Sequence, residues 1–190
     1  MFIRLTYCLL LTFVTLCLLV GGEKTTIHVV THSHLDAGWI YDLNRCYNVV
    51  KDIFNTVLDS LLKNKERKYT VGDIYYFRRW YEEKDLNAQS KVRRLISDGQ
   101  IEIVHGGATS TDEATVSFQD IIDNMIIGRH WLLKEFGVIP NVGWQLDPFG
   151  HSAANARIFA DMGMDGLVFA RMHNTQLYDW AIHKKKDFIW

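Results

Sequence analysis

The chain has 190 residues, of which 48% are hydrophobic, 23% are charged and only two are proline. This is the composition of a globular protein, and it excludes collagen, a coiled coil and extensive disorder. Lysine and arginine number 21, against 22 aspartate and glutamate residues. Proteins that hold nucleic acid through its phosphates carry a basic excess that this chain lacks, so we expect no nucleic-acid partner.

The first 22 residues predict a secretory signal peptide. Arg4 precedes an apolar run at 9–20, and two glycines follow that run. The run is shorter than the roughly 20 apolar residues that a membrane span needs, although counting from Leu5 leaves an uncleaved signal anchor as the alternative. We therefore expect entry into the secretory pathway, removal of residues 1–22, and a mature chain from about Glu23 without stable membrane insertion.

Residues 23–190 alternate short β-rich segments with longer helical ones. Strands are predicted at 27–31, 68–71, 101–104, 142–146 and 167–169. Helices are predicted at 49–62, 74–81, 87–99, 117–136 and 152–163. This alternation predicts one α/β domain with a parallel sheet, either open or closed as a barrel. Five strands are fewer than the eight of a typical parallel barrel, so we expect the domain to be incomplete in this chain.

The longest predicted helix has the clearest boundaries. Ser117 and Asp120 have the spacing of an N-cap residue and its N3 partner, and Gly137 follows the last turn. The helix before it is predicted to start at an Asn87 cap.

In parallel α/β sheets, reactive side chains lie in the loops that follow the carboxyl ends of the strands. After the first predicted strand, His32, His34 and Asp36 are spaced two residues apart, so in extended backbone all three point to one side. Two imidazoles and a carboxylate suit a borderline cation such as zinc. The alternative is that these side chains cap the next helix or form hydrogen bonds within the loop.

Two further loops carry carboxylates. The fourth predicted strand delivers Asp147 into a Pro-Phe-Gly turn, where it can bind a metal, act as a nucleophile, or simply form the turn before Pro148. The third predicted strand is followed by paired glycines, which permit close backbone approach, and then by Asp112 and Glu113. The alternative for at least one of these two acids is a favourable charge at a helix N-terminus.

Taken together, three segments resemble glycoside hydrolase family 38, the retaining α-mannosidases, in order and spacing. They are HSHLDAGW, GGATSTDEAT and WQLDPFGHSAANARIFADMGMDG, and the resemblance covers nearly all of 27–190. It implies the N-terminal part of a parallel β/α barrel-like catalytic domain at 23–190. It also implies hydrolysis of α-mannosyl linkages in glycans, with zinc (Zn²⁺) as the cofactor. Together with the predicted signal peptide, it favours a lysosomal or extracellular protein.

The resemblance also implies roles for single residues. His34 and Asp36 correspond to zinc ligands, and Asp147 corresponds to both a zinc ligand and the covalent nucleophile. Trp39 corresponds to an aromatic residue that packs against the sugar, and Arg171 to an arginine that lines the site. His32 is then expected to orient a ligand from outside the metal's own shell.

The general acid and a fourth zinc ligand, a histidine, are implied to lie beyond this chain. We therefore expect residues 23–190 to be an N-terminal fragment or truncated gene product that is inactive alone. One alternative is a catalytically inactive, glycan-binding remnant or pseudoenzyme. A zinc polysaccharide deacetylase also builds metal sites from His and Asp at strand ends, but the DPFGHS segment argues against it.

Overall fold

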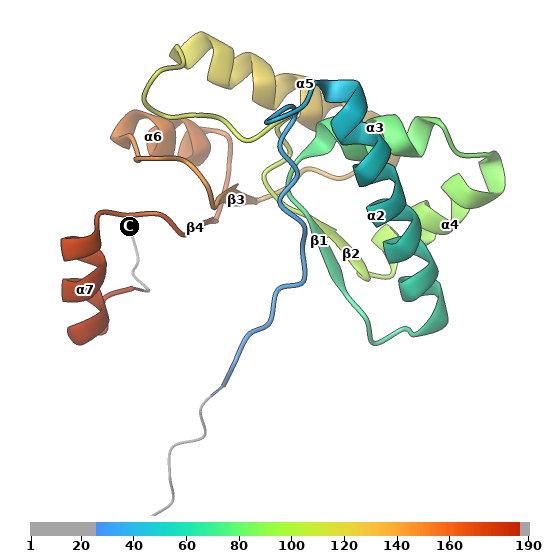
Figure 1. The fold of residues 1–190 in the computed structure, drawn as a ribbon, viewed down its shortest axis with the longest axis horizontal. Coiled ribbons are helices and arrows are strands. Elements are labelled where there is room, and N and C mark those ends of the chain that lie inside the picture. Colours follow the sequence, from blue (N-terminus) through green and yellow to red (C-terminus); the bar gives the residue numbers. More distant parts are fainter. Residues whose placement is uncertain (1–25, 187–190) are drawn as a thin grey trace, which may run out of the picture.

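The computed structural model describes residues 26–186, so the predicted signal peptide at 1–22 lies outside the described residues. Helices and strands alternate along the chain (Figure 1). The elements are α2 (Leu43–Lys63), β1 (Tyr69–Val71), α3 (Ile74–Glu82), α4 (Leu86–Ser97), β2 (Ile101–Ile103), α5 (Phe118–Phe136), β3 (Val142–Gln145), α6 (Ala153–Asp161), β4 (Gly166–Phe169) and α7 (Asn174–Ile182). None of the helices within 26–186 combines the length and the apolar character needed to cross a bilayer.

The four strands form two parallel pairs. β1 pairs with β2 so that Tyr69 lies opposite Ile101, and β3 pairs with β4 so that Gln145 lies opposite Phe169. The pairs meet where the His105 N–H, just after β2, donates to the Val142 carbonyl over 2.6 Å. β1 thus lies beside β2 and β3 beside β4, in two separate pairs. The predicted parallel α/β class is confirmed, whereas closure into a barrel stays a prediction.

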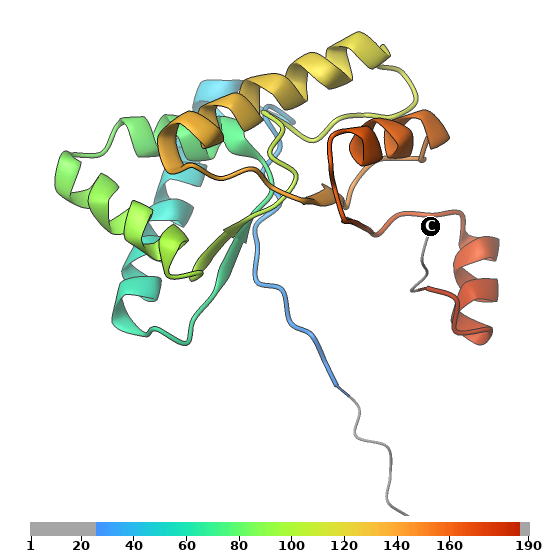
Figure 2. The same cartoon turned by 180° about the vertical axis from the view of Figure 1, so that it is seen from behind.

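The hydrophobic core surrounds β1 and β2, and α2, α3 and α4 contribute most of its residues; Figure 2 shows these helices beside the two strands. Aromatic rings dominate this core, because Phe77 contacts Phe54, Trp80 and Trp131 with ring centres 5.6 to 6.2 Å apart. Such pairs stabilise a core beyond the area that they bury. By contrast, α7 has no buried residue. The half of the chain that carries β1 and β2 is therefore the rigid support for the loops described below.

The predicted strand at 27–31 is wrong. The isolated parallel bridge to Thr70 is made by His32, just after this segment, and the Thr70 N–H donates to the Thr31 carbonyl over 2.8 Å. Ile27 and Val29 are each 80% exposed. A strand needs a paired neighbour and a covered face, and within 26–186 no strand is formed at 27–31 and these side chains are left uncovered.

Helix boundaries follow the predicted caps in most cases. The Ser117 side chain accepts the Asp120 N–H over 3.3 Å at the start of α5, and Gly137 ends that helix with a left-handed φ of 68°. α4 starts at Leu86, and its N-cap is Asp85, two residues before the predicted Asn87 cap; the Asp85 side chain accepts the Ala88 N–H over 2.7 Å. A carboxylate at the N-cap satisfies a free N–H and favours the helix dipole. α7 is an additional helix that the periodicity did not predict.

The paired glycines after β2 bring the backbone against α5. A Cβ at Gly128 of α5 would lie 2.1 Å from the Gly106 carbonyl oxygen, and a Cβ at Gly107 would lie 2.7 Å from the Asn124 amide nitrogen. The close backbone approach that the glycine pair predicts is therefore an approach to a helix. It fixes the start of the loop that carries Asp112 and Glu113.

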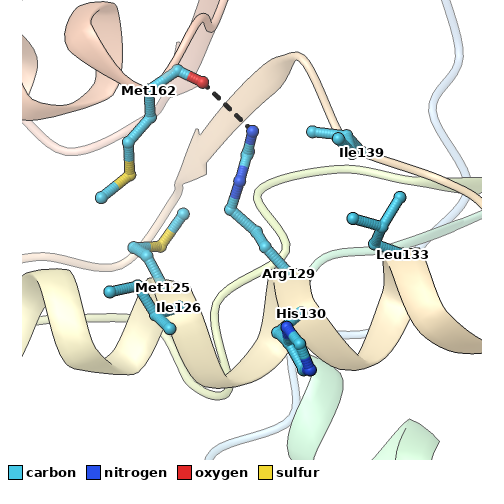
Figure 3. A pocket seen from close by; sticks show the side chains of 7 residues that line it. All are labelled: Met125, Ile126, Arg129, His130, Leu133, Ile139 and Met162. Atoms are coloured by element: carbon cyan, nitrogen blue, oxygen red, sulfur yellow. Dashed lines mark hydrogen bonds between the residues drawn. The ribbon is translucent and has the colours of Figure 1, made fainter.

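A hollow of about 260 Å³ lies between α5 and the segments around β3 and α6 (Figure 3). It is lined mostly by apolar side chains: Met125, Ile126, Leu133, Ile139 and Met162, together with Arg129 and His130. The Arg129 guanidinium extends across it and donates to the carbonyls of Pro140 and Met162 over 2.6 and 3.1 Å. These bonds join α5 to the ends of the segments that surround β3.

The buried His105 makes the free energy of unfolding depend on pH. Its side chain is fully buried behind β3, and burial, helped by the charge of Arg129, lowers its pKa from 6.5 to about 4. Its neutral Nδ1 accepts the Trp144 N–H. Because the unfolded chain takes up this proton at higher pH than the folded chain, stability is highest above pH 6.5. Stability should then fall as the pH is lowered from 6.5 to roughly 4, by about 3 kcal/mol in all.

Urea denaturation between pH 7 and pH 4.5 measures this effect. His105 has a left-handed φ of 60°, which Asn tolerates well, so His105→Asn is the suitable non-titrating variant. We expect the variant to lose most of the slope below pH 6.5, whatever its stability at pH 7. An unchanged slope in the variant would assign the pH dependence to other groups.

Candidate metal and catalytic site

Parallel register brings residues from distant loops together at one end of the strands. Gln145 of β3 lies opposite Phe169 of β4, so Asp147 and Arg171, each two residues further on, emerge side by side. His32 pairs with Thr70 of β1, so His34 emerges at the same end. The loops at these carboxyl ends are where the sequence places its reactive residues.

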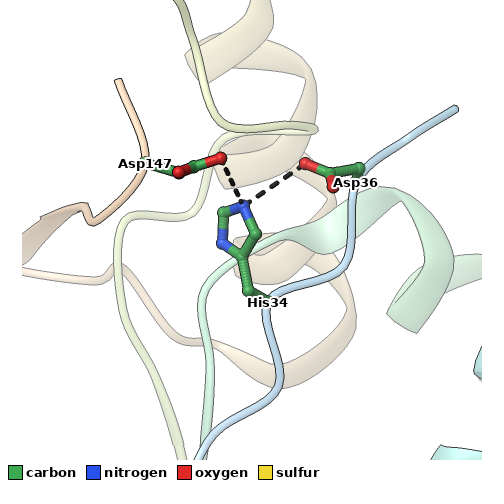
Figure 4. A group of neighbouring side chains, drawn as sticks. All are labelled: His34, Asp36 and Asp147. Atoms are coloured by element: carbon green, nitrogen blue, oxygen red, sulfur yellow. Dashed lines mark ion pairs between the residues drawn. The ribbon is translucent and has the colours of Figure 1, made fainter. Parts of the chain in front are cut away.

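His34, Asp36 and Asp147 form a compact cluster at this end (Figure 4). The Nε2 atom of His34 lies 3.3 Å from Oδ1 of Asp36 and 3.4 Å from Oδ2 of Asp147. Figure 4 shows the imidazole pointing between the two carboxylates, which come from different loops. The structure therefore brings together the three residues that were predicted to bind metal.

The spacing of the cluster fits a shared cation. Both contacts are longer than the roughly 2.7–3.2 Å of ordinary N–H···O bonds, whereas tetrahedral ligands about 2.1 Å from zinc lie about 3.4 Å apart. One imidazole nitrogen and two carboxylate oxygens, all within 4.8 Å of one another, are also the ligand types that zinc takes. These three residues fit a zinc ion.

Arg171 fixes the second oxygen of Asp147. Its Nε donates to Oδ1 of Asp147 over 2.6 Å, and a second guanidinium nitrogen, Nη2, contacts the same oxygen. One carboxylate oxygen thus faces the cluster while the other is held by a cation. The position of Arg171 beside the candidate nucleophile agrees with the site-lining role that the resemblance implies for it.

Local packing holds the segment that carries His34 and Asp36. Leu35 and Ala37 pack against the aromatic core, which turns the alternate residues away from it. Gly38 then reverses the chain with a φ of 88°, and its N–H donates to the Asp36 carbonyl over 2.9 Å. The alternation of apolar and polar residues in HSHLDA therefore has a structural cause.

A polar cavity of about 200 Å³ adjoins Asp36. It is lined by Leu35, Asp36, Ala37, Gly38, Asp73, Thr109 and Ser110. Asp73 is the N-cap residue of α3, but the first helical N–H groups donate to the carbonyls of Gly107 and Ala108 over 3.2 and 2.8 Å. Its carboxylate instead accepts the Ser110 hydroxyl over 2.8 Å.

Asp73 was missed by sequence analysis. Burial raises the pKa of its carboxyl group above the usual range, although the Ser110 hydrogen bond and the nearby His34 lower it. Its position directly after β1 was a usable signal, because the rule that selected Asp147 applies equally to the Gly-Asp that follows Val71. The cavity thus has two carboxylates on its wall.

Two exposed aromatic rings belong to the same loops. Trp39 is 74% exposed and Phe149 is 75% exposed, and the Arg171 guanidinium lies 5.6 Å from the centre of the Phe149 ring. Large exposed rings beside polar groups are suited to binding a sugar face. The packing of Trp39 against substrate stays a prediction.

His32 lies apart from the three-residue cluster. Its Nδ1 is 3.2 Å from the Val30 carbonyl, and its ring meets the Trp144 ring edge-on with centres 5.1 Å apart. The side chains of His32, His34 and Asp36 therefore do not all point to one site. His34 and Asp36 lie close to Asp147, whereas His32 packs against Trp144 of β3. The predicted orienting role of His32 stays a prediction.

The acidic pair after the paired glycines is divided between two environments. Asp112 accepts the Ala114 N–H over 3.1 Å and the Thr115 hydroxyl, and these bonds lower its pKa. The Glu113 side chain is only 2% exposed, and it accepts the Ser152 N–H at the start of α6 over 2.7 Å. Asp112 stabilises a local turn, while Glu113 lies against the loop that carries Asp147.

Fold and site together define an α/β protein whose polar site is built on the carboxyl ends of parallel strands. Comparison with known families agrees: residues 24–190 match the model described as Glycosyl hydrolases family 38 N-terminal domain. The chain belongs to glycoside hydrolase family 38.

Named relatives show the same similarity. The chain is 37% identical over 173 residues to a lysosomal alpha-mannosidase of Dictyostelium discoideum, and 36% identical over 169 residues to the human alpha-mannosidase 2. These alignments cover 86% and 88% of the chain but only 17% and 15% of the relatives. The chain thus spans about a sixth of the length of these relatives.

A solved structure shares the fold. The crystal structure of an alpha-mannosidase from Enterococcus faecalis V583 matches with a TM-score of 0.68 at 20% identity, over 78% of this chain and 17% of that one. At this identity the match supports the arrangement of helices and strands alone.

Proposed function

We propose that the protein carrying this chain is a retaining, zinc-dependent α-mannosidase that hydrolyses α-mannosyl linkages of glycans. Membership of family 38 and the names of the relatives support the substrate class. The observation that carries the proposal is the Asp147 carboxylate, with one oxygen held by Arg171 and the other 3.4 Å from His34. On this proposal residues 23–190 are the N-terminal part of a β/α barrel-like catalytic domain.

His34, Asp36 and Asp147 would hold the zinc. When bound, the ion supplies positive charge that binds sugar hydroxyls and favours a distorted ring. The remaining roles belong to the chain's own residues.

Asp147 is the proposed nucleophile of a double displacement. One of its oxygens attacks the anomeric carbon, the bond to the leaving oxygen breaks, and a carboxylic acid protonates that oxygen. Water then cleaves the resulting glycosyl ester, which restores the Asp147 carboxylate and retains the anomeric configuration. Arg171 keeps the carboxylate in a fixed orientation during both steps, and Trp39 packs against the sugar.

The proposed location is the secretory pathway, with the lysosome or the extracellular space as the destination. The signal-like residues 1–22 support entry into this pathway, and one relative is named as lysosomal.

Zinc affinity tests the ligand assignment. We expect His34→Ala and Asp36→Ala to weaken zinc binding by more than the roughly 10 to 100-fold expected for His32→Ala. His130→Ala is the matched control, because this exposed imidazole lies on α5 and should not affect affinity. Competition with a chelating indicator measures each dissociation constant. Zinc binding that survives His34→Ala but not His32→Ala would reverse the assignment.

A fluorinated mannosyl trap tests the nucleophile in protein produced from the complete reading frame that contains this chain. We expect the label on Asp147, and we expect Asp147→Ala to lower turnover of an aryl α-mannoside on the order of 10⁴-fold or more. Mass spectrometry of the peptides locates the label.

Two outcomes would contradict the proposal. A label on Asp112 or Glu113 would move the nucleophile to the loop after β2. Zinc-dependent mannoside binding without any turnover would instead favour a glycan-binding remnant.

A further inference from the structure

Glu113 is a buried carboxylate surrounded by donors from one short segment. Its Oε1 lies 3.1 Å from both the Gln145 amide nitrogen and Nδ1 of His151, and its Oε2 accepts the Ser152 N–H over 2.7 Å. Only 2% of the Glu113 side chain is exposed. Burying a carboxylate is costly unless its partners compensate, so this arrangement requires all three donors.

The three donors lie on both sides of Asp147 in the sequence. Gln145 is the last residue of β3, His151 follows the Pro-Phe-Gly turn, and Ser152 is the N-cap of α6. The residues between them form an irregular turn outside any helix or strand. Glu113 therefore holds both ends of the turn that presents Asp147.

His151 also contacts the backbone of Arg171. Nε2 of His151 lies 2.8 Å from the Arg171 carbonyl oxygen. A carbonyl only accepts, so Nε2 carries a proton, and the contact between Nδ1 and the Glu113 carboxylate then requires a second shared proton. Hydrogen bonds with an ionised partner are about twice as strong as neutral ones. His151 thus links Glu113 to the backbone of the residue whose side chain holds Asp147.

A helix cap alone does not explain Glu113. The Ser152 hydroxyl already accepts the Ala154 N–H over 3.2 Å, as an N-cap residue does. A second, buried and charged group adds little to that function. Its contacts with Gln145 and His151 instead join the loops that follow β2, β3 and β4.

We propose that Glu113 is a positioning residue, which fixes Asp147 and Arg171 relative to each other through Gln145, His151 and Ser152. The inference rests on the proposed function for its catalytic consequence. Glu113, Gln145 and His151 are not among the proposed zinc ligands, so they act on the site through Asp147 and Arg171.

The test compares Glu113→Gln with Asp112→Asn in protein from the complete reading frame. Both variants remove one charge from adjacent residues, but Asp112 bonds only within its own turn. We expect Glu113→Gln to lower kcat for an aryl α-mannoside by about 10 to 100-fold, with KM changed much less, and to weaken zinc binding by a similar factor. Asp112→Asn should leave kcat, KM and zinc affinity unchanged.

A second variant, His151→Gln, completes a double-mutant cycle. If Glu113 acts through His151, the double variant should lose about as much kcat as either single variant. Additive losses would overturn the proposed link. So would a Glu113→Gln protein with lowered thermal stability but unchanged kcat and zinc affinity in its folded fraction.

The two proposals can fail separately. Wild-type protein that binds zinc but does not hydrolyse α-mannosides would overturn the proposed function, while weaker zinc binding in Glu113→Gln alone would still support the positioning role. Hydrolysis by the wild type with normal kcat and zinc affinity in Glu113→Gln would retain the function and reject the positioning role.

Discussion

The site depends on one carboxylate that is held from two sides. One oxygen of the Asp147 carboxylate faces His34, and the other accepts the Arg171 N–H over 2.6 Å. A ligand shared with a cation must be ionised and fixed, and an attacking oxygen must point along one line. The guanidinium provides the fixed orientation, and in the proposed function the cluster of His34, Asp36 and Asp147 holds the cation.

The fold meets this requirement through register. Because β3 and β4 are parallel and Gln145 lies opposite Phe169, equal steps beyond these residues bring Asp147 beside Arg171. An antiparallel pair would send the two chains in opposite directions. The aromatic core under β1 and β2 supports the other side of the site, since Leu35 packs on it directly before Asp36. Rigid elements therefore carry loops that have little regular structure themselves.

Much of the site was predictable because strand ends are visible in the sequence. His34, Asp36 and Asp147 each follow an apolar segment, and the structure brings them within 4.8 Å. Arg171 came from the resemblance alone, because pairing register is not visible in a pattern of apolar residues. Burial is equally invisible there, so the partners of Glu113 were found only in the structure. The prediction of a strand at 27–31 was wrong because a pattern of apolar residues does not show whether a neighbouring strand is present to pair with the segment.

The proposed zinc site can be tested by diffraction data collected on both sides of the zinc absorption edge, from crystals of the protein grown with zinc. We expect an anomalous peak about 2.0–2.2 Å from the His34 nitrogen and from one oxygen each of Asp36 and Asp147. A fully formed site with the three side chains in place but no peak between them, or a peak bound by other residues, would contradict it.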